Sequence, residues 1–432
     1  MPKKINRFIG AIQLPGDKSI SHRSLIIGSQ ATGIVKISNL LESGDIFSTI
    51  QCLKKFGIKI IKKKKDYFVY GQVVGGLEKF NGTLNCGNSG TTARLLLGLL
   101  STYPYTIKFI GDRSLSKRPM GRVIDVLKNF GASVKPSNKN NFPLTFQGSF
   151  VGLQTDYKLK VASAQIKSAF LLAALNTPGI SSIEENFDTR DHTEIMLKYL
   201  GAKIQVKKKS QKKIIFLEGK MPLDAKDIYV PGDISSASFM IVLALISKNS
   251  KILIKNVLLN PTRTGILDAL KKMKAQIQIK NKRLCSGEIV GDLFVKSSKL
   301  RSLTIQGEMA PRLIDEYPIL FIAALFAKGT SKFYGIEELR FKESDRIETM
   351  KEGLSKVGIN IKSTKSSVEI KGNKNFNVLN NTVIDAKGDH RIAMSFKILS
   401  EAINKKFKIK DFQYVQTSFP TFTKIIKNLK KN

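Results

Sequence analysis

The chain has 432 residues and a formal net charge of +38, with 42% hydrophobic and 25% charged residues. This composition is that of a globular protein with enough apolar material for buried cores, and the length allows about three ordinary domains or fewer large ones. The longest apolar runs, 239–246 and 319–327, are well short of the roughly 20 residues that a membrane-spanning helix needs. They therefore predict buried helices, and the composition excludes a disordered or membrane-spanning protein.

The positive charge does not by itself predict a nucleic-acid partner. The densest lysine runs, 62–65 and 207–213, stand between short β-like segments and contain no aromatic residues on which bases could stack. We interpret both runs as solvated hairpins. A basic nucleic-acid-binding protein remains an alternative function, which salt-dependent DNA binding without enzyme activity would support.

The cysteines and the N-terminal residues indicate a compartment. Cys52, Cys86 and Cys285 have no spacing typical of disulfide pairing or metal binding, which favours a reducing environment. A motif-bearing polar loop begins by Leu14, which leaves no room for a signal peptide. We expect a cytoplasmic protein.

One pattern recurs six times along the chain. A polar loop rich in Gly, Ser and Asp is followed by an apolar helix, a turn and a β-like strand, and a second, amphipathic helix then precedes another strand. The six copies begin at Gly16, Gly87, Ser163, Gly232, Asp315 and Gly388. The sixth copy lacks its closing strand, and the strand-like residues 7–13 are expected to complete it, bringing both termini into one domain.

The polar loops have the composition of anion sites. The first helix of each copy is nearly all apolar and is expected to be buried, so that its N-terminus opens from the loop and offers unpaired N–H groups. Most of the arginines fall in such loops, and a guanidinium binds phosphate or carboxylate with two parallel hydrogen bonds. Some of these arginines are instead expected to pair with carboxylates inside the protein. The pattern favours small phosphorylated anions as substrates.

Nine motifs follow one another in the order and spacing of a known family. They occupy residues 14–23 (LPGDKSISHR), 84–94, 114–122, 163–169 (SAQIKSA), 189–194 (TRDHTE), 229–239, 315–329, 339–350 (LRFKESDRIETM) and 388–396. Each motif is weak alone, but together they resemble the 3-phosphoshikimate 1-carboxyvinyltransferase, or EPSP synthase, family over essentially the whole chain.

The resemblance implies an α/β (α+β) fold with two lobes, each built from three of the six units. One lobe is expected to combine residues 1–15 with 232–432, and the other to span 16–231. The chain would cross between them near Pro15 and Pro231, and the active site would lie in the cleft between the lobes.

The resemblance also implies a reaction. Members of the family transfer the enolpyruvyl group of phosphoenolpyruvate to the 5-hydroxyl of shikimate 3-phosphate and release phosphate without a cofactor. The implied phosphoshikimate contacts are Lys18, Ser19, Arg23, Ser163, Gln165, Arg190, Asp315 and Lys342. The implied phosphoenolpyruvate contacts are Lys18, Asn88, Gly90, Arg118, Gln165, Arg346 and Arg391. No metal, nucleic acid or membrane is expected as a partner, and the enzyme is expected to be a monomer and a target of the herbicide glyphosate.

Three residues are the implied catalytic groups. Asp315, helped by Lys18, would take the proton of the 5-hydroxyl, and Glu343 would protonate the methylene carbon and later remove a proton from it, through a tetrahedral intermediate. The sequence leaves another role open for Glu343, since it and Asp345 could simply cap the helix that begins near Ser344.

Three positions depart from the family pattern: Ala164 stands where many members carry a second serine, Glu338 where some have an asparagine, and Thr417 where some have a lysine that approaches phosphoenolpyruvate. They put the contacts to phosphoenolpyruvate in doubt, but not the reaction. The nearest alternative is UDP-N-acetylglucosamine enolpyruvyl transferase, which usually carries a reactive cysteine in the loop that matches 112–118, where this chain has none. An RNA-end cyclase is a more distant alternative, and its nucleotide-linked histidine has no clear counterpart here.

Overall fold

The computed structural model describes residues 6–136, 140–186, 188–209, 212–372, 378 and 380–431. The chain divides into two compact units. The N-terminal unit comprises Gly16–Val230 and Cys285–Glu288, and the C-terminal unit comprises the residues up to Pro15, Pro231–Leu284 and those from Ile289 onward. The grouping of Cys285–Glu288 with the N-terminal unit is a detail that the sequence did not predict.

In the part of the N-terminal unit that the structure describes there are three small sheets and six α-helices. The helices are α1 (Lys18–Gly28), α2 (Gly44–Lys54), α3 (Gly90–Leu100), α4 (Gly121–Leu127), α5 (Ala164–Leu175) and α6 (His192–Tyr199). The first sheet has the order β13 (Leu223–Asp224), β2 (Ala31–Ser38), β4 (Asp66–Gln72), β3 (Ile60–Lys63), with β14 (Ile228–Tyr229) also on β2. The second is β5 (Gly82–Asn85), β6 (Thr106–Ile110), β8 (Leu144–Gln147), β7 (Ser133–Lys135). The third is β11 (Ile204–Lys209), β12 (Lys212–Glu218), β10 (Ile180–Glu185), β9 (Asp156–Lys158).

The C-terminal unit repeats this arrangement. Its helices are α7 (Ile234–Ile246), α8 (Gly265–Lys272), α9 (Ala310–Leu313), α10 (Tyr317–Leu325), α11 (Arg346–Lys356), α12 (His390–Ala402) and α13 (Phe422–Leu429). One sheet has the order β16 (Gln276–Cys285), β17 (Glu288–Lys296), β15 (Lys251–Leu258), β1 (Arg7–Gln13), β24 (Lys430–Lys431). The others are β18 (Thr304–Ile305), β19 (Thr330–Tyr334), β21 (Ser367–Lys371), β20 (Lys362–Ser363), and the pair β22 (Thr382–Asp385), β23 (Phe407–Lys410).

The six predicted repeats are confirmed. Each repeat supplies one buried helix (α1, α3, α5, α7, α10 or α12) and the strand that follows it (β2, β6, β10, β15, β19 or β23), and each of these strands belongs to a different sheet. The expected place of residues 7–13 is wrong. β1 pairs in parallel with β15 of the fourth repeat, with Ile9 opposite Lys251, instead of completing the sixth. β24 pairs with the other side of β1, so both chain ends do lie in one unit.

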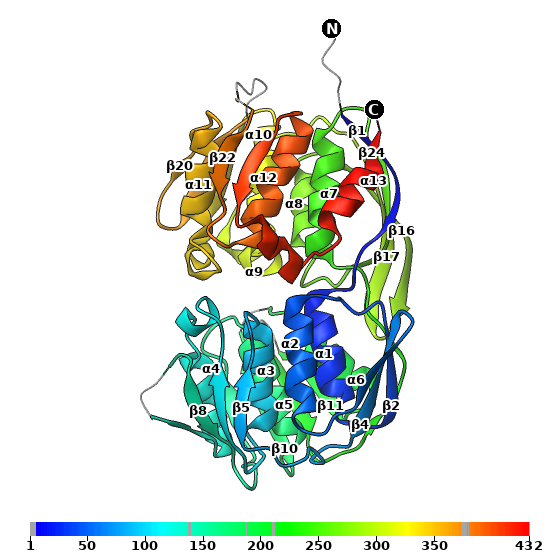
Figure 1. Ribbon diagram of the computed structural model, residues 1–432, viewed down its shortest axis with the longest axis vertical. Helices are drawn as coiled ribbons and strands as arrows, with labels where there is room; N and C mark the ends of the chain where they lie inside the picture. Colours follow the sequence, from blue (N-terminus) through cyan, green and yellow to red (C-terminus); the bar gives the residue numbers. More distant parts are fainter. Residues whose placement is uncertain are drawn as a thin grey trace. The chain divides into compact units, whose positions relative to one another are not determined.

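The helices that begin the repeats form the core of each unit. In the C-terminal unit α7, α10 and α12 pack against one another, and in the N-terminal unit α3 packs against α1 and α5 (Figure 1). All nine residues of α10 are buried, as is every residue of α7 from Ile234 to Leu245. A helix that is apolar on all sides gains stability only when it is surrounded in this way. In α7 the polar residues are confined to the N-terminal half, and several candidate site residues lie at or just before the starts of the buried helices.

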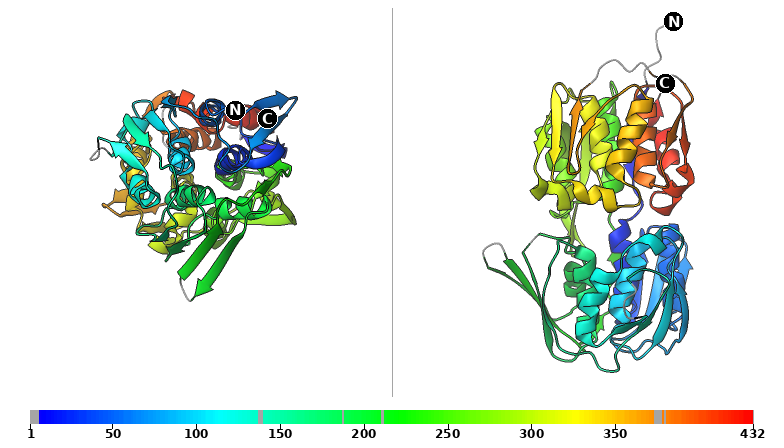
Figure 2. Two further views of the ribbon diagram at one scale, coloured as in Figure 1. Left: turned by 90° about the horizontal axis from the view of Figure 1, so that it is seen from below. Right: turned by 90° about the vertical axis from the view of Figure 1, so that its left-hand side faces the viewer.

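The lysine runs lie on hairpins, as predicted. Lys62 and Lys63 end β3, and their ammonium groups lie 5.6 and 5.5 Å from the ring centres of Tyr67 and Phe68 on β4. The β11–β12 hairpin projects from its sheet (Figure 2), and Lys207 lies over the ring of Phe216 there. Within the described residues, every helix is too short or too polar to cross a bilayer.

Candidate active site

Most of the predicted site residues lie at or near the start of a buried helix. Asp17, Ser89, Ser163, Asp233 and Asp389 are the residues before α1, α3, α5, α7 and α12, and each side chain accepts a hydrogen bond from a backbone N–H of the helix that follows. Such caps fix the helix start. The remaining first-turn N–H groups and the positive end of the helix dipole stay available to an anion.

Lys18 and Arg23 both belong to α1, the first at its start and the second in its middle. The Lys18 ammonium pairs with the carboxylate of Asp45, at the start of α2. Arg23 is buried. Its Nε donates to the hydroxyl of Thr193 and its Nη2 to the hydroxyl of Ser168, each at a distance of 2.7 Å. Arg23 therefore already uses part of its donor set within the protein, which is the structural role that the sequence left open for some arginines.

A second group surrounds the start of α3. Arg118 Nη2 donates to Asn88 Oδ1 at 3.4 Å, and Asn88 Nδ2 donates to Asp112 Oδ2 at 2.6 Å. A methyl group added at Gly90 would lie 2.8 Å from Arg94 Nη1 and 3.3 Å from Arg118 Nη1. Gly90 thus lets two guanidinium groups approach the backbone. Its φ lies outside the left-handed region, so a positive φ is not what requires a glycine here.

Arg94 is a residue that the predicted site omitted. Its Nη1 donates to Gln165 Oε1 at 2.9 Å, and Gln165 Nε2 donates to Thr91 Oγ1 at 3.2 Å. These two contacts fix the side-chain amide of Gln165. Arg94 is the last residue of the 84–94 motif and lies in α3, but no pattern in the sequence indicates that it reaches α5.

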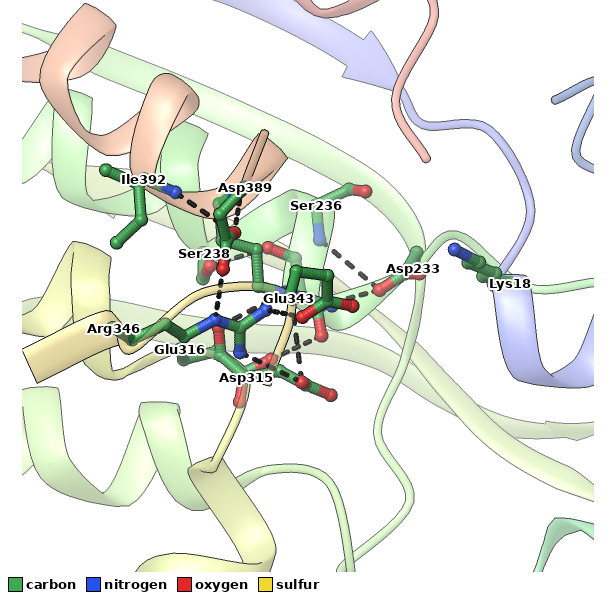
Figure 3. A network of polar contacts seen from close by, with 12 residues as sticks. Lys18, Asp233, Ser236, Ser238, Asp315, Glu316, Glu343, Arg346, Asp389 and Ile392 are labelled. Atoms are coloured by element: carbon green, nitrogen blue, oxygen red, sulfur yellow. Dashed lines mark hydrogen bonds and ion pairs between the residues drawn. The ribbon is translucent and has the colours of Figure 1, made fainter. Parts of the chain in front are cut away.

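The C-terminal unit gathers three carboxylates around Arg346, the first residue of α11. Its Nε lies 2.8 Å from Asp389 Oδ2, its Nη2 2.7 Å from Glu343 Oε2, and its Nη1 3.5 Å from Asp315 Oδ1 (Figure 3). Burial works to lower the pKa of Arg346, but Asp389, Glu343 and Asp315 outweigh it and raise that pKa, so the guanidinium is charged. The two predicted acid–base residues, Asp315 and Glu343, are therefore brought together on one guanidinium.

Arg391 and Lys342 flank this cluster. Arg391 Nη1 donates to the Asp315 carbonyl at 3.2 Å, and its Nε lies 3.7 Å from Asp315 Oδ1. Burial lowers the pKa of Lys342, and the nearby carboxylate of Asp315 opposes that effect. A lysine that has lost hydration in this way gains most from a bound anion.

The structure distinguishes the two alternatives for Glu343 and Asp345, helix capping and a role in catalysis. Asp345 caps α11, since its Oδ1 accepts from Glu348 N at 3.0 Å, and its other oxygen pairs with Arg340 at 2.6 Å. The N-cap of α11 is Asp345, whereas Glu343 Oε2 accepts from Arg346 Nη2 at 2.7 Å. The capping alternative therefore holds for Asp345, and Glu343 remains a candidate for chemistry.

The predicted site residues are divided between the two units. The N-terminal unit holds Lys18, Ser19, Arg23, Asn88, Gly90, Arg118, Ser163, Gln165 and Arg190, and the C-terminal unit holds Asp315, Lys342, Glu343, Arg346 and Arg391. The sequence also missed Asp45 and Asp389, the partners of Lys18 and Arg346, because both pairings join distant helices. Among the described residues, no group of three His, Cys, Asp or Glu side chains is arranged to hold a metal ion.

Residues 2–426 match the family model of EPSP synthase (3-phosphoshikimate 1-carboxyvinyltransferase). The chain belongs to the EPSP synthase family. It is 42% identical over 424 residues to 3-phosphoshikimate 1-carboxyvinyltransferase of Zymomonas mobilis, covering 97% of this chain and 94% of the relative. It is 43% identical over 427 residues to the same enzyme of Bartonella henselae, covering 99% and 97%.

Solved structures agree with this membership. EPSP synthase from Acinetobacter baumannii is 37% identical, with a TM-score of 0.86 over 99% of this chain and 96% of that chain. The enolpyruvyl transferase NikO from Streptomyces tendae, at 14% identity and a TM-score of 0.76 over 98% of this chain and 95% of its own, shows the same fold. The chain is thus an enzyme of the transferase class with the enolpyruvyl-transferase fold, and its relatives do not favour the sugar-nucleotide or nucleic-acid alternatives.

Proposed function

We propose that this EPSP synthase family member transfers the enolpyruvyl group of phosphoenolpyruvate to the 5-hydroxyl of shikimate 3-phosphate, giving 5-enolpyruvylshikimate 3-phosphate and phosphate. It acts in the cytoplasm as a monomer and needs no nucleic acid, membrane or cofactor. The single observation that carries the proposal is the cluster in which Arg346 contacts both Asp315 and Glu343. This cluster combines an anion-binding cation with two groups able to move protons.

The charged side chains among the predicted contacts suit the two anionic substrates. Phosphoenolpyruvate and shikimate 3-phosphate each carry a carboxylate and a phosphate, and placing them side by side requires cations to offset their repulsion. Arg118, Arg346 and Arg391 are proposed to bind phosphoenolpyruvate together with Asn88, Gly90 and Gln165. Ser19, Arg23, Ser163, Arg190 and Lys342 are proposed to bind shikimate 3-phosphate, with Lys18 contacting both.

The proton transfers follow from the carboxylates. Asp315 accepts the proton of the 5-hydroxyl as oxygen attacks C2 of phosphoenolpyruvate, while Glu343, which enters this step as the carboxylic acid, delivers its proton to C3. In the elimination, Glu343 takes a proton back from C3 as phosphate leaves, which restores the double bond. Arg346 contacts both carboxylates in the absence of substrate, so substrate binding is expected to redistribute its hydrogen bonds.

One departure from the family pattern has a local explanation. The hydroxyl of Thr417 donates to the Tyr414 carbonyl at 2.7 Å, so it stabilises its own turn. A threonine in this position cannot supply the cation that some members place there. We therefore propose that Arg346 and Arg391 carry the carboxylate and phosphate of phosphoenolpyruvate in this unit without a further lysine.

The proposal is tested with the purified protein, phosphoenolpyruvate and one of two acceptors, followed by ³¹P NMR. With shikimate 3-phosphate we expect the phosphoenolpyruvate signal to be replaced by inorganic phosphate and a shifted ester signal. With UDP-N-acetylglucosamine we expect no change. Turnover with the sugar nucleotide alone would overturn the proposal in favour of the alternative transferase.

A further inference from the structure

A fully buried lysine lies behind the proposed phosphoshikimate contacts. Lys167 is in the first turns of α5, two residues after Gln165, and its side chain is 0% exposed. Its ammonium lies 3.1 Å from Glu185 Oε1 and 2.6 Å from Glu194 Oε1. Burial works to lower the pKa of Lys167, but Glu194 and Glu185 outweigh it and raise that pKa, so the group is charged.

The two carboxylates stand at opposite ends of one loop. Glu185 is the last residue of β10, and Glu194 lies in the first turn of α6. The loop between β10 and α6 carries Arg190. One ammonium thus joins the strand end to the helix start on either side of this arginine.

A second contact fixes the loop from within. The hydroxyl of Thr189, the residue before Arg190, donates a hydrogen bond of 2.7 Å to Glu185 Oε2. Both oxygens of Glu185 are therefore used, one by the lysine and one by the loop. The position of the Arg190 backbone depends on where Glu185 is held, and Glu185 is held by Lys167.

The next residue of α5 links the same region to Arg23. The hydroxyls of Ser168 and Thr193 lie 2.7 Å apart, and Arg23 donates to both. Lys167 and Ser168 therefore connect α5 to the start of α6 by adjacent contacts. Arg23 is thus anchored by hydroxyls of the residues next to Lys167 and Glu194.

Loss of the ammonium would affect this network more than loss of an exposed lysine. Glu185 is 1% and Glu194 6% exposed, and without Lys167 their charges would be close together, buried and uncompensated. Burial already raises the pKa of Glu194, and its Oε2 has no hydrogen-bond partner among the described residues. Repulsion between the two carboxylates, or protonation of Glu194 in place of that repulsion, would remove the ionic contact that joins the two ends of the loop.

We propose that Lys167 is a positioning residue for shikimate 3-phosphate: by clamping Glu185 and Glu194, it holds the loop that presents Arg190 to the substrate's anionic groups. The inference rests on the proposed function, in which Arg190 contacts that substrate. Lys167 itself touches no substrate.

The test is a double-mutant cycle between Lys167→Met and Arg190→Ala, with the Kd of shikimate 3-phosphate measured by calorimetry. This readout needs no turnover, so it is independent of whether the transfer reaction occurs. We expect Lys167→Met to weaken binding by about tenfold or more in the wild-type background, and by no more than about twofold in Arg190→Ala. An equal loss in both backgrounds, or an Arg190→Ala variant that binds like wild type, would overturn the proposal.

Two further variants separate positioning from general loss of structure. Thr189→Val removes one hydroxyl and leaves the ion pairs intact, so it replaces Lys167→Met in the cycle if that variant does not fold. We expect it to weaken the binding of shikimate 3-phosphate about threefold, and to have no effect in the Arg190→Ala background. Lys397→Met, which breaks the Lys397–Glu401 pair at 2.7 Å in the other unit, should leave the Kd unchanged. In active protein, the KM for phosphoenolpyruvate should stay within about twofold in the Lys167 and Thr189 variants. If the KM values for phosphoenolpyruvate and for shikimate 3-phosphate rose by the same factor, this would also contradict the proposal that Lys167 positions the shikimate 3-phosphate contacts.

Discussion

Arg346 and Asp389 form an ion pair from which solvent is excluded, with Nε 2.8 Å from Oδ2 and the two side chains 1% and 0% exposed. Asp389 also caps α12, and Arg346 is the first residue of α11, so the pair joins the starts of two helices. With its Nε held in this way, Arg346 directs its terminal nitrogens toward Glu343 and Asp315. The arrangement depends on a planar group with several donors.

Arg346→Lys tests this dependence. A lysine ammonium cannot reach three separate carboxylates in the same geometry, so we expect kcat/KM for phosphoenolpyruvate to fall by about two orders of magnitude or more. The matched control is Arg312→Lys, since Arg312 makes a comparable 2.7 Å pair with Asp268 at the surface. Steady-state kinetics in which both variants retain similar activity would contradict the role of Arg346.

Gly90→Ala is expected to discriminate between two ligands of the phosphoenolpyruvate site. The added methyl would meet the ends of the Arg94 and Arg118 side chains rather than backbone, and φ is not left-handed, so the variant should fold. Glyphosate, the family's inhibitor, is longer than phosphoenolpyruvate, and we expect its Ki to rise more than the KM for the substrate. The thermal midpoint, KM and Ki are measured on one preparation. If Ki and KM rose by the same factor, the added methyl would not be excluding glyphosate by its size.

Lys342 predicts a pH dependence of substrate binding. Because burial lowers the pKa of Lys342, its neutral form becomes populated as pH rises between that lowered pKa and the ordinary lysine value of about 10.4. A bound anion favours the charged form, so shikimate 3-phosphate should take up protons in this window and bind more weakly as pH rises. Below the window the ammonium is already charged, and no uptake is expected.

Calorimetry at several pH values across this window, in two buffers of different ionisation enthalpy, measures this uptake. The control is Lys342→Met, in which the uptake should be lost. Equal proton uptake in the wild type and in this variant would assign it to another group.

The cysteines should differ in reactivity. The hydrogen bond with Cys52, together with burial, raises the pKa of Cys86 well above its ordinary value, so little reactive thiolate exists near neutral pH. Cys285 is only half-buried. With an aromatic disulfide reagent followed by mass spectrometry, we expect labelling of Cys285 in the native protein and of Cys86 only after unfolding, with Cys285→Ser as control. Labelling of Cys86 at the rate of Cys285 would contradict this.

The repeats could be predicted from the sequence because each one carries its own signal. A capping residue followed by an apolar run, such as Asp233 before α7, marks a buried helix in any context. The pairing of β1 could not be predicted in the same way. Its residues indicate a strand, but the choice between β15 and β23 as partner depends on which sheet edge is free in the folded unit.

Site residues could be predicted by type but not by partner. Lys18, Arg118 and Arg346 stand in motifs, whereas Asp45, Arg94 and Asp389 are identified by contacts across long sequence separations. Lys167 is the clearest case. In the sequence it is one lysine among many in a basic chain, and only its complete burial between Glu185 and Glu194 distinguishes it.

Asp315→Asn tests most directly that the cluster around Arg346 performs the chemistry. The amide has nearly the same shape as the carboxylate but cannot accept the proton of the 5-hydroxyl, so binding should survive while the chemical step slows. The measurement is kcat for phosphate release from phosphoenolpyruvate and shikimate 3-phosphate, with calorimetric Kd values on the same protein. We predict a kcat lowered by about two to four orders of magnitude, with Kd within about threefold of wild type. A variant that keeps a near wild-type kcat would contradict the account.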